Sequence, residues 1–402
     1  MRNKKGLIFV YVFLCAYLIF SNIPVFNLIK MPNNFYVSYD EIERVNEEHS
    51  FGNFVNLSLN EGEVTTGQDK PSEAEVVFKL FGFIPVKKVK VKLLPEEEVY
   101  VGGFPIGLTL QTEGAVVVSD TVVDVKSAAV SKNTSFKAGD VIKEINGVKI
   151  NSLDDIDLAL YNATSEKVLV IYQRNNQDYK QEAGLLKDGN GRYKLGLWVR
   201  DDFSGVGTLT FIKKDTNEFG ALGHAVTNGL NDNILPMVDG DIYSCSLVNV
   251  EKGQKNNPGE LRCVFVQKNR HGSILKNTKV GIYGKLDDND LIDQNRTALL
   301  GGRLSVRPGK AKIVSNVSGI TEEYDIEIIK ANFQSKCDDK SLVLRVTDKR
   351  LLELTGGIVQ GMSGSPIIQN DRVVGAVTHV FVSDPAKGYG VYTDWMLEQM
   401  SY

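Results

Sequence analysis

Cysteine and histidine are both scarce in this chain of 402 residues, which contains four of each. The cysteines form no CxxC pair and the histidines no HExxH motif, so the usual ligand clusters of a zinc site are missing. The sequence therefore predicts no bound metal and no other cofactor. After the first apolar segment, Cys245, Cys263 and Cys337 make an odd number, which leaves open a Cys245–Cys263 disulfide or three free thiols.

A strong charge imbalance and long helical repeats are also missing. The formal net charge is -4, which gives no reason to expect nucleic acid as a partner. Charged residues make up 24% of the chain and hydrophobic residues 42%, a balance typical of globular rather than disordered proteins. Short Val- and Ile-rich runs stand between many of the 37 glycines, and this pattern favours a mainly β fold.

The N-terminus has the pattern of a targeting segment. Arg2, Lys4 and Lys5 precede an unbroken apolar run over residues 7–20, and no small-x-small cleavage site follows it. We therefore expect residues 1–30 to form an uncleaved signal anchor, with a cleaved signal peptide as the alternative. Either interpretation places the rest of the chain outside the cytoplasm, at the extracytoplasmic face of the membrane if the anchor is kept.

Residues 31–98 form an N-terminal region and linker to which the sequence assigns no role. Residues 61–73 are rich in Gly, Ser and Thr, as linkers are. Apolar and charged residues alternate over 76–94, and this alternation predicts a pair of strands.

Residues 99–183 have the marks of a small recognition domain. A glycine-rich turn enters a strand, Asn146-Gly147 is a strong hairpin signal, and Ser152 is a suitable N-cap for a helix over 152–161. The run from Ala138 to Val148 resembles PDZ domains, which bind an extended peptide at a sheet edge. The resemblance implies that the glycine-rich loop receives a peptide C-terminus, unless it is a simple turn in a spacer domain. The peptide-binding residues would be Gly102, Gly103, Ile106, Gly107 and Leu108.

From residue 184 to the end, short strands separated by glycines suit a barrel-type all-β domain. One motif in it is Gly361-Met362-Ser363-Gly364-Ser365-Pro366. A nucleophilic serine needs a tight turn that exposes its Oγ and aligns backbone N–H groups. The motif resembles the nucleophile loop of chymotrypsin-like peptidases, which implies an oxyanion hole at Gly361 and Ser363. The alternative is an ordinary Gly/Ser turn between two strands.

A second motif, Gly223-His224-Ala225, supplies the histidine that such a serine needs as general base. His224 precedes Ser363 in the chain, an order that fits a chymotrypsin-like double β-barrel and neither the α/β-hydrolases nor subtilisin. We expect His379 to be structural because it lies on a mostly apolar strand, and His49 and His271 to be solvated in polar loops.

The anchor, the PDZ-like segment and the motifs GHAVT and QGMSGSPIIQ together resemble the stage IV sporulation protein B family, the signalling serine peptidases of endospore-forming bacteria. The resemblance implies a serine endopeptidase exported from the forespore into the space between two membranes. Its protein substrate would be a membrane-anchored regulator of an intramembrane protease, cleaved to activate a late sporulation sigma factor. Family members also cleave themselves near the N-terminus.

The resemblance also assigns Asp348 as the acid of the catalytic triad. In double-barrel peptidases the acid more often lies well before the nucleophile, so Asp239, Asp241 and Asp287 stay open as rivals.

Two other functions remain as alternatives. One is a membrane-tethered PDZ scaffold with an inactive peptidase domain, although the intact His224 and Ser363 motifs argue against it. The other is a secreted degradative protease, which would suit a cleaved signal peptide.

Overall fold

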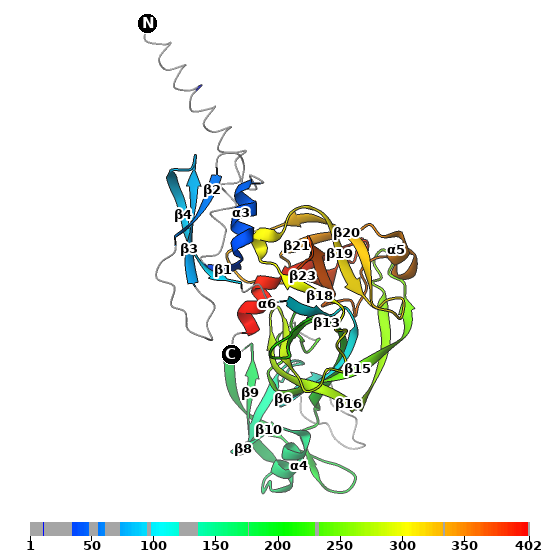
Figure 1. Cartoon of the computed structure of the whole chain (residues 1–402). Coiled ribbons are helices and arrows are strands. Elements are labelled where there is room, and N and C mark those ends of the chain that lie inside the picture. Colours follow the sequence, from blue (N-terminus) through cyan, green and yellow to red (C-terminus); the bar gives the residue numbers. More distant parts are fainter. Residues whose placement is uncertain are drawn as a thin grey trace.

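The computed structural model describes Tyr11 and residues 34–47, 55–60, 73–94, 98–119, 136–175, 177–229, 233–332 and 334–400 (Figure 1). Except for Tyr11, the predicted anchor over residues 1–30 lies outside these residues. In the part of the chain that the structure describes, no helix has the length and apolar character needed to span a membrane. Strands predominate throughout, so the prediction of a mainly β protein is confirmed.

A small sheet precedes the rest of the protein and stands at one side of it in Figure 1. Its strands lie in the order β1-β4-β3-β2, with β1 parallel to β4 and the other pairs antiparallel. The alternation over 76–94 did predict the β3–β4 pair, and the buried Val76, Phe78 and Val91 form its core. The elements are β1 (Asn34–Val37), α3 (Tyr39–Glu47), β2 (Val55–Asn60), β3 (Glu73–Leu80) and β4 (Ile84–Leu93).

Buried polar contacts hold this sheet to the C-terminal part of the chain. The Glu41 carboxylate, on α3, accepts hydrogen bonds from the Ser305 hydroxyl and, at 2.7 Å, from the Gly302 N–H. The Arg303 guanidinium pairs with the Asp394 carboxylate at 2.5 Å while lying 4.4 Å from the Trp395 ring. Both side chains of the Arg303–Asp394 pair are almost completely buried, so each charge depends on the other.

The PDZ-like segment has its own hydrophobic core, in which Ala115, Ile142 and Leu160 are buried. The Asn146-Gly147 turn has the positive φ values that such hairpins require, and Ser152 forms a capping box with Asp155. Both of these sequence predictions are therefore confirmed. The elements are the C-terminal half of β6 (Pro105–Ser119), β7 (Val141–Ile145), β8 (Val148–Lys149), α4 (Leu153–Tyr161), β9 (Lys167–Arg174) and β10 (Gln177–Gly184).

The remaining strands belong with the PDZ-like strands to one closed hydrogen-bonded network, and they pack around two separate hydrophobic cores of a barrel. The N-terminal half of this barrel packs around residues such as Leu110 and Phe219. Its strands are the start of β6, β13 (Trp198–Lys213), β14 (Glu218–Ala221), β15 (Met237–Glu251), β16 (Glu260–Thr278) and β17 (Gly281–Leu286). Strand β5 (Glu98–Val101) pairs with β13 but buries Val99 and Val101 in the second core. A two-stranded ribbon, β11 (Leu186–Lys187) and β12 (Tyr193–Lys194), precedes β13.

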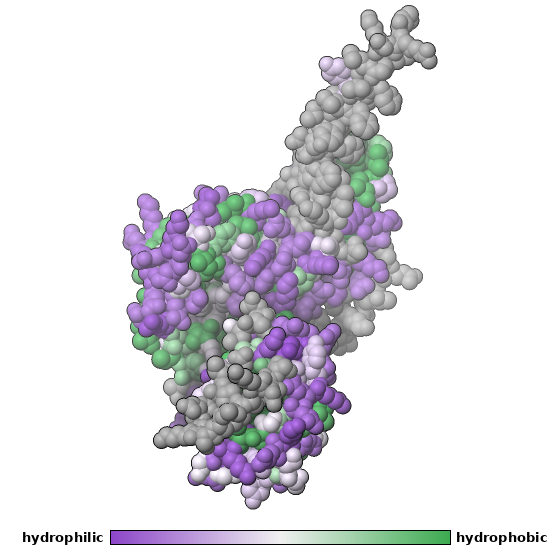
Figure 2. Space-filling view, turned by 180° about the vertical axis from the view of Figure 1, so that it is seen from behind, coloured by the Kyte–Doolittle hydropathy of each residue, from purple (hydrophilic) through white to green (hydrophobic). Residues whose placement is uncertain are grey.

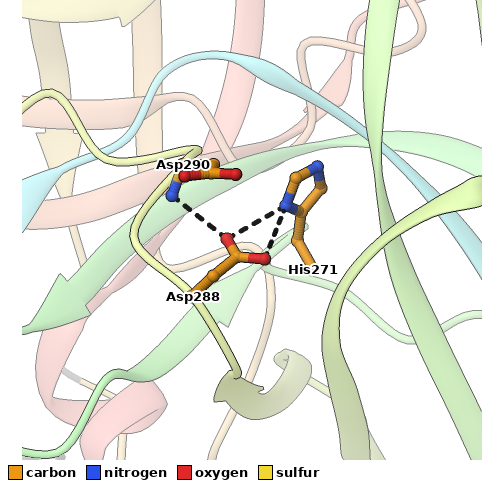
Figure 3. A group of neighbouring side chains, drawn as sticks. All are labelled: His271, Asp288 and Asp290. Atoms are coloured by element: carbon orange, nitrogen blue, oxygen red, sulfur yellow. Dashed lines mark hydrogen bonds and ion pairs between the residues drawn. The ribbon is translucent and has the colours of Figure 1, made fainter.

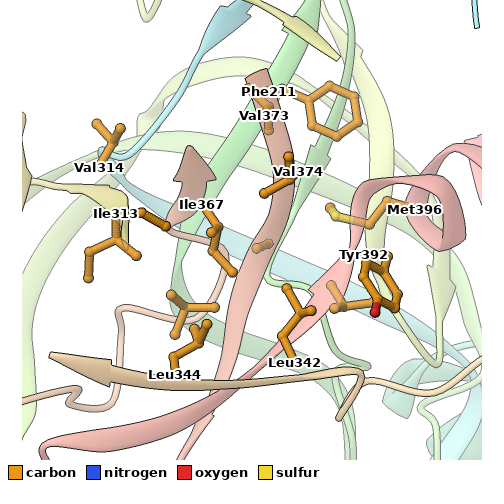
Figure 4. Packing of buried hydrophobic residues seen from close by; sticks show 14 of the residues in the cluster. Phe211, Ile313, Val314, Leu342, Leu344, Ile367, Val373, Val374, Tyr392 and Met396 are labelled. Atoms are coloured by element: carbon orange, nitrogen blue, oxygen red, sulfur yellow. The ribbon is translucent and has the colours of Figure 1, made fainter. Parts of the chain in front are cut away.

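The C-terminal half of the barrel packs around the second core. Figure 4 shows side chains such as Ile313, Leu344 and Val373 meeting there with Met396 of the last helix. The elements are β18 (Thr297–Leu300), η1 (Arg303–Ser305), β19 (Gly309–Ser315), β20 (Glu322–Ala331), β21 (Leu342–Val346), α5 (Lys349–Thr355), β22 (Pro366–Gln369), β23 (Arg372–Val380), β24 (Lys387–Tyr392) and α6 (Thr393–Met400).

The structure divides the chain differently from the predicted boundaries of 99–183 and 184–402. Strand β5 and the start of β6 are barrel strands, because residues 105–111 of β6 pair with both β13 and β15. Strands β6 and β13 then continue together into the PDZ-like core, where Val116 pairs with Arg200. The PDZ-like segment is therefore inserted between two long strands of the barrel. The boundary at 99 stays a prediction, because the single 15-residue strand β6 serves both cores and belongs to both parts of the chain.

The cysteines of the chain are free thiols where the structure describes them. Cys245 and Cys263 lie on the paired strands β15 and β16 and hydrogen-bond to each other, and this bond raises the pKa of Cys245. Of the two alternatives that the sequence left open, the structure shows free thiols.

We expect Asp394→Asn to lower the free energy of unfolding by about 3–5 kcal/mol, because it leaves the buried Arg303 charge without its partner. Urea unfolding at pH 7 measures the change. Glu323→Gln is the matched control, since its pair with Lys312 is half-exposed and should contribute less than about 1 kcal/mol. Equal losses in the two variants would contradict the importance of the buried pair.

Candidate active site

The Ser363 loop is held tightly against strand β13 of the other barrel half. The Thr208 N–H donates to the Ser363 carbonyl at 2.9 Å, and the Thr208 hydroxyl donates to the Gly361 carbonyl at 2.7 Å. Gly361 and Gly364 have φ values of 93° and 99°, a region that favours glycine. A Cβ atom on Gly364 would lie 1.9 Å from the Thr208 carbonyl oxygen, so no larger residue fits there.

The His224 turn follows β14 and is bound by the same residue of β13. The Leu222 N–H donates to the Thr208 carbonyl at 3.2 Å, and Leu222 and Gly223 both have positive φ. On the far side of the histidine, the Asn277 side chain bonds to both the N–H and the carbonyl of Val226. The fold therefore brings the two predicted motifs, far apart in the sequence, to one residue of β13.

The hydrogen bonding of His224 suits a general base. Its Nδ1 lies 2.8 Å from the Ala225 carbonyl oxygen. Because a carbonyl can only accept, this bond places the proton on Nδ1 and leaves Nε2 free to take one. Burial lowers the pKa of His224, which keeps the ring neutral near pH 7.

Ser363 is not engaged with His224 in this conformation. The Ser363 hydroxyl donates to the Thr378 carbonyl at 2.7 Å instead. No hydrogen bond joins Ser363 to His224 among the described residues. If His224 is the base for Ser363, the serine must release Thr378 before its proton can be transferred.

His379, which the sequence led us to expect as a structural residue, lies against the proposed base. The rings of His224 and His379 are 4.9 Å apart between centroids. Burial, with the nearby His224, lowers the pKa of His379 to about 4, so this ring is neutral at physiological pH. Within the described part of the chain, its buried Nδ1 has no hydrogen-bond partner. No local pattern in the sequence indicates this pairing, because the two histidines belong to different barrel halves.

Asp339 is a carboxylate that the sequence analysis did not consider. One of its oxygens lies 3.8 Å from Nε2 of His379, and its backbone carbonyl accepts a bond from the Thr378 hydroxyl. Burial, together with the neighbouring Asp338, raises the pKa of Asp339 to about 6. Asp339 is thus next to the segment that carries both the serine's present acceptor and His379.

Asp348, the triad acid implied by the resemblance, has a different position in the structure. Its carboxylate caps helix α5 by accepting the N–H groups of Arg350 and Leu351. Strand β21 separates Asp348 from Asp339, and its five residues at ~3.3 Å each span about 16 Å. In this structure Asp348 serves as a helix cap, and no hydrogen bond or ion pair joins it to His224 among the described residues. Its role as the triad acid stays a prediction.

The three rival carboxylates are also engaged elsewhere. Asp241 and Asp287 both bind the guanidinium of Arg270, and Asp239 accepts the N–H of Gly240. None of these contacts involves His224.

The predicted oxyanion hole is compatible with the loop geometry. Among the described residues, the N–H groups of Gly361 and Ser363 have no hydrogen-bond acceptor, whereas the intervening Met362 N–H bonds to Val359. Two backbone N–H groups without an acceptor, on a turn whose conformation favours glycine, are what the stabilisation of a developing oxyanion requires. Their role stays a prediction.

The predicted peptide-binding residues are not on an open edge. Gly102 and Gly103 bond to the backbone of β13, and Ile106 and Leu108 are buried in the barrel core. Gly107 pairs with Val206 on one side and Tyr243 on the other, so both edges of β6 are occupied there. The prediction that these five residues receive a peptide C-terminus is wrong for this structure, because β13 and β15 already use the hydrogen-bonding groups of that strand.

His271 was expected to be solvated but is mostly buried and bonded to the Asp288 carboxylate at 3.0 Å (Figure 3). Together with Asp290, these residues bring ligand atoms within 4.8 Å of one another, and they are ligand types that divalent cations use. A cation would have to replace the His271–Asp288 bond. The group lies at the end of β17 away from Ala221, and hence away from His224. His49 lies outside the described residues.

A family model described as SpoIVB peptidase S55 matches residues 191–397, just over half of the chain. The chain belongs to the SpoIVB peptidase S55 family. It is therefore a serine peptidase, and the match covers both the His224 and the Ser363 loops. A PDZ domain model matches residues 102–183 of this peptidase.

The solved structures that match this S55 peptidase have low sequence identity and low TM-scores. The PDZ domain of an SdrC-like protein from Listeria monocytogenes is 23% identical, covering 22% of this chain and 90% of its own, with a TM-score of 0.19. The inactive form of the Rv3671c protease is 10% identical, covering 49% and 85%, and the active form from M. tuberculosis is 12% identical, covering 50% and 74%. Both have a TM-score of 0.29, so the family models alone carry the assignment. No curated protein matches significantly.

We expect the reactivity of Ser363 to fall at acid pH with a midpoint below 6.5, the ordinary pKa of histidine. Protonated His224 cannot act as a base, and burial lowers its pKa, so reactivity is retained above this midpoint and lost below it. The rate of labelling by a fluorophosphonate probe, followed from pH 4.5 to 8, measures the effect. Circular dichroism over the same range controls for unfolding, and a midpoint at or above 6.5 would contradict the burial argument.

Proposed function

We propose that this protein is a membrane-tethered, extracytoplasmic serine endopeptidase in which Ser363 is the nucleophile and His224 the general base. The observation that carries the proposal is the joint binding of both loops by Thr208 of β13. The two hydrophobic cores, one behind each loop, support a chymotrypsin-like double barrel with its site between the halves. The family supports cleavage of a membrane-anchored regulator in sporulation signalling, and of the chain itself.

The chemistry follows from the positions of the two side chains. The Ser363 hydroxyl leaves the Thr378 carbonyl, donates its proton to Nε2 of His224, and its Oγ forms a bond to the scissile carbonyl carbon. The oxyanion would be held by the N–H groups of Gly361 and Ser363. His224 then gives the proton to the departing amine, and a water molecule, activated by the same imidazole, hydrolyses the acyl-enzyme.

The imidazolium formed at His224 needs stabilisation, which a triad acid usually provides. In this structure the Ala225 carbonyl fixes the tautomer, so orientation does not require a carboxylate. We infer that Asp339, beside His379, supplies the compensating negative charge. Its pKa of about 6 leaves it mostly ionised at neutral pH.

The bond from Ser363 to Thr378 makes this conformation a resting state of the enzyme. Thr378 and His379 are neighbours near the end of β23. A movement of this end of the strand would therefore free Ser363 and shift His379 at the same time. The PDZ-like segment is joined to the barrel through β6 and β13, and β13 also holds the Ser363 loop. This supports a regulatory role for the PDZ-like segment, through which a protein substrate or peptide would act.

The nucleophile is tested with the full chain and its Ser363→Ala variant, incubated in parallel with a fluorophosphonate probe. We expect labelling and any self-cleavage in the wild type and neither in the variant, with N-terminal sequencing of fragments to identify the cut bond. Ser365→Ala is the matched control, because this serine lies in the same loop with a buried hydroxyl and no assigned role. Labelling of neither wild type nor control would favour a scaffold over an enzyme.

Asp339→Asn and Asp348→Ala distinguish the two candidate acids. We expect Asp339→Asn to slow probe labelling on the order of tenfold, which corresponds to about 1.4 kcal/mol of lost charge stabilisation. Asp348→Ala should leave labelling unchanged but destabilise the fold by about 0.5–2 kcal/mol through loss of the α5 cap. The labelling rates and urea midpoints of the two variants decide which carboxylate is the catalytic acid. The opposite pattern would restore Asp348 as the acid.

A further inference from the structure

The turn between β3 and β4 carries an exposed apolar cluster, which we call the tip: Phe81, Phe83, Ile84 and Val86. Phe83 is 73% exposed and Phe81 is 51% exposed, and their ring centroids are 6.4 Å apart. Hydrophobic surface is visible at this end of the small sheet in Figure 2. Large aromatic side chains exposed to water are unfavourable, so their clustering on one turn is typical of a binding surface.

The backbone conformation of the turn is unusual for an aromatic residue. Phe81 and Gly82 have φ values of 55° and 79°, and the Phe83 N–H bonds to the Leu80 carbonyl, so the hairpin closes through two left-handed residues. Such turns strongly prefer Asn-Gly, and a bulky aromatic residue at positive φ is rare. Phe81 therefore costs stability in a position where it gains little burial.

The part of the hairpin sequence that contains the tip carries only positive charge. The stretch from Lys79 to Lys90 contains four lysines and no carboxylate. Lys88 and Lys90 are exposed, and Lys88 reaches Glu75 further along β3 at 3.1 Å. Lysine stems can lie along apolar surface while their ammonium groups reach anionic partners. The tip thus combines apolar side chains at the end of a hairpin with positive charge just behind them.

The tip also lies where a large surface can reach it. Strand β1 pairs with Lys90–Leu93, the C-terminal part of β4, so the turn is at the opposite end of the sheet. The contacts to the barrel run through α3 and β1, which leaves the β3–β4 turn at the side of the molecule (Figure 1).

We propose that the tip enters the interfacial layer of an anionic lipid bilayer, with Phe81 and Phe83 at the boundary of headgroups and acyl chains and the lysines against lipid phosphates. Aromatic and basic residues together are the chemistry that binds such a surface. This contact is distinct from the predicted anchor over residues 1–30. Two points of attachment would fix the orientation of the peptidase to the membrane, which an anchor alone would not.

The test uses the full chain reconstituted in phosphatidylglycerol vesicles. The wild type contains only Trp198 and Trp395, so the fluorescence added by Phe83→Trp is obtained by difference. We expect brominated lipids to quench this added emission at least about twofold, because the ring lies at the lipid interface. Ile320→Trp, in an exposed turn of the C-terminal barrel half, is the matched control and should not be quenched.

Two further variants of the Phe83→Trp protein separate the apolar and the electrostatic parts. Phe81→Asn should reduce quenching while leaving the melting temperature equal or higher, since Asn suits the left-handed position. Lys87→Gln/Lys88→Gln/Lys90→Gln should reduce quenching in phosphatidylglycerol vesicles, and addition of salt to the parent should do the same.

The proposal is overturned if the emission added by Phe83→Trp stays unquenched and typical of an aqueous environment in these vesicles. It is equally overturned if that emission shifts to shorter wavelength without lipid and in a concentration-dependent way, because the tip would then be covered by a second copy of the chain. Neither result depends on whether Ser363 is the nucleophile, so failure here is separate from failure of the proposed catalysis.

Discussion

Thr208 makes the contact on which the proposed site depends. Its N–H and hydroxyl hold the Ser363 loop, and its carbonyl holds the turn before His224. One residue of β13 therefore fixes both loops, although they come from opposite halves of the barrel. Gly364 makes this approach possible, because any side chain there would overlap the Thr208 carbonyl. The requirement for glycine in the serine motif is thus as much one of packing as of turn conformation.

The same strand connects the site to the PDZ-like segment. Strands β6 and β13 pair in the barrel and continue as a pair into the PDZ-like core. A displacement of that segment would reach Thr208 along β13, whose pairing with β6 is irregular between Trp198 and Asp202. This continuity gives a physical route by which a recognition domain could influence the serine, which is held by Thr378 in the resting conformation.

Buried charge fixes the N-terminal sheet to the same body. Arg303 pairs with Asp394 and contacts the rings of Phe35 and Trp395, so it joins β1 to α6. Removing one partner of such a pair leaves an uncompensated buried charge, which is strongly destabilising. The β3–β4 hairpin, with its exposed aromatic tip, is carried by this attachment and not by the barrel itself.

The sequence by itself determined the features that depend on neighbouring residues. These are the Asn146-Gly147 hairpin, the Ser152 cap, the glycine pattern around Ser363 and the His224 motif, from which the family and the serine peptidase activity followed. Only the tertiary structure decided which distant groups meet. It placed Asp348 at a helix cap, brought His379 and Asp339 to the site, and used residues 102–108 as a connection between strands and the start of barrel strand β6. The reason is that barrel closure joins residues that are far apart in the sequence. In addition, when both edges of a strand are hydrogen-bonded to neighbouring strands, the residues of that strand give no local signal of it.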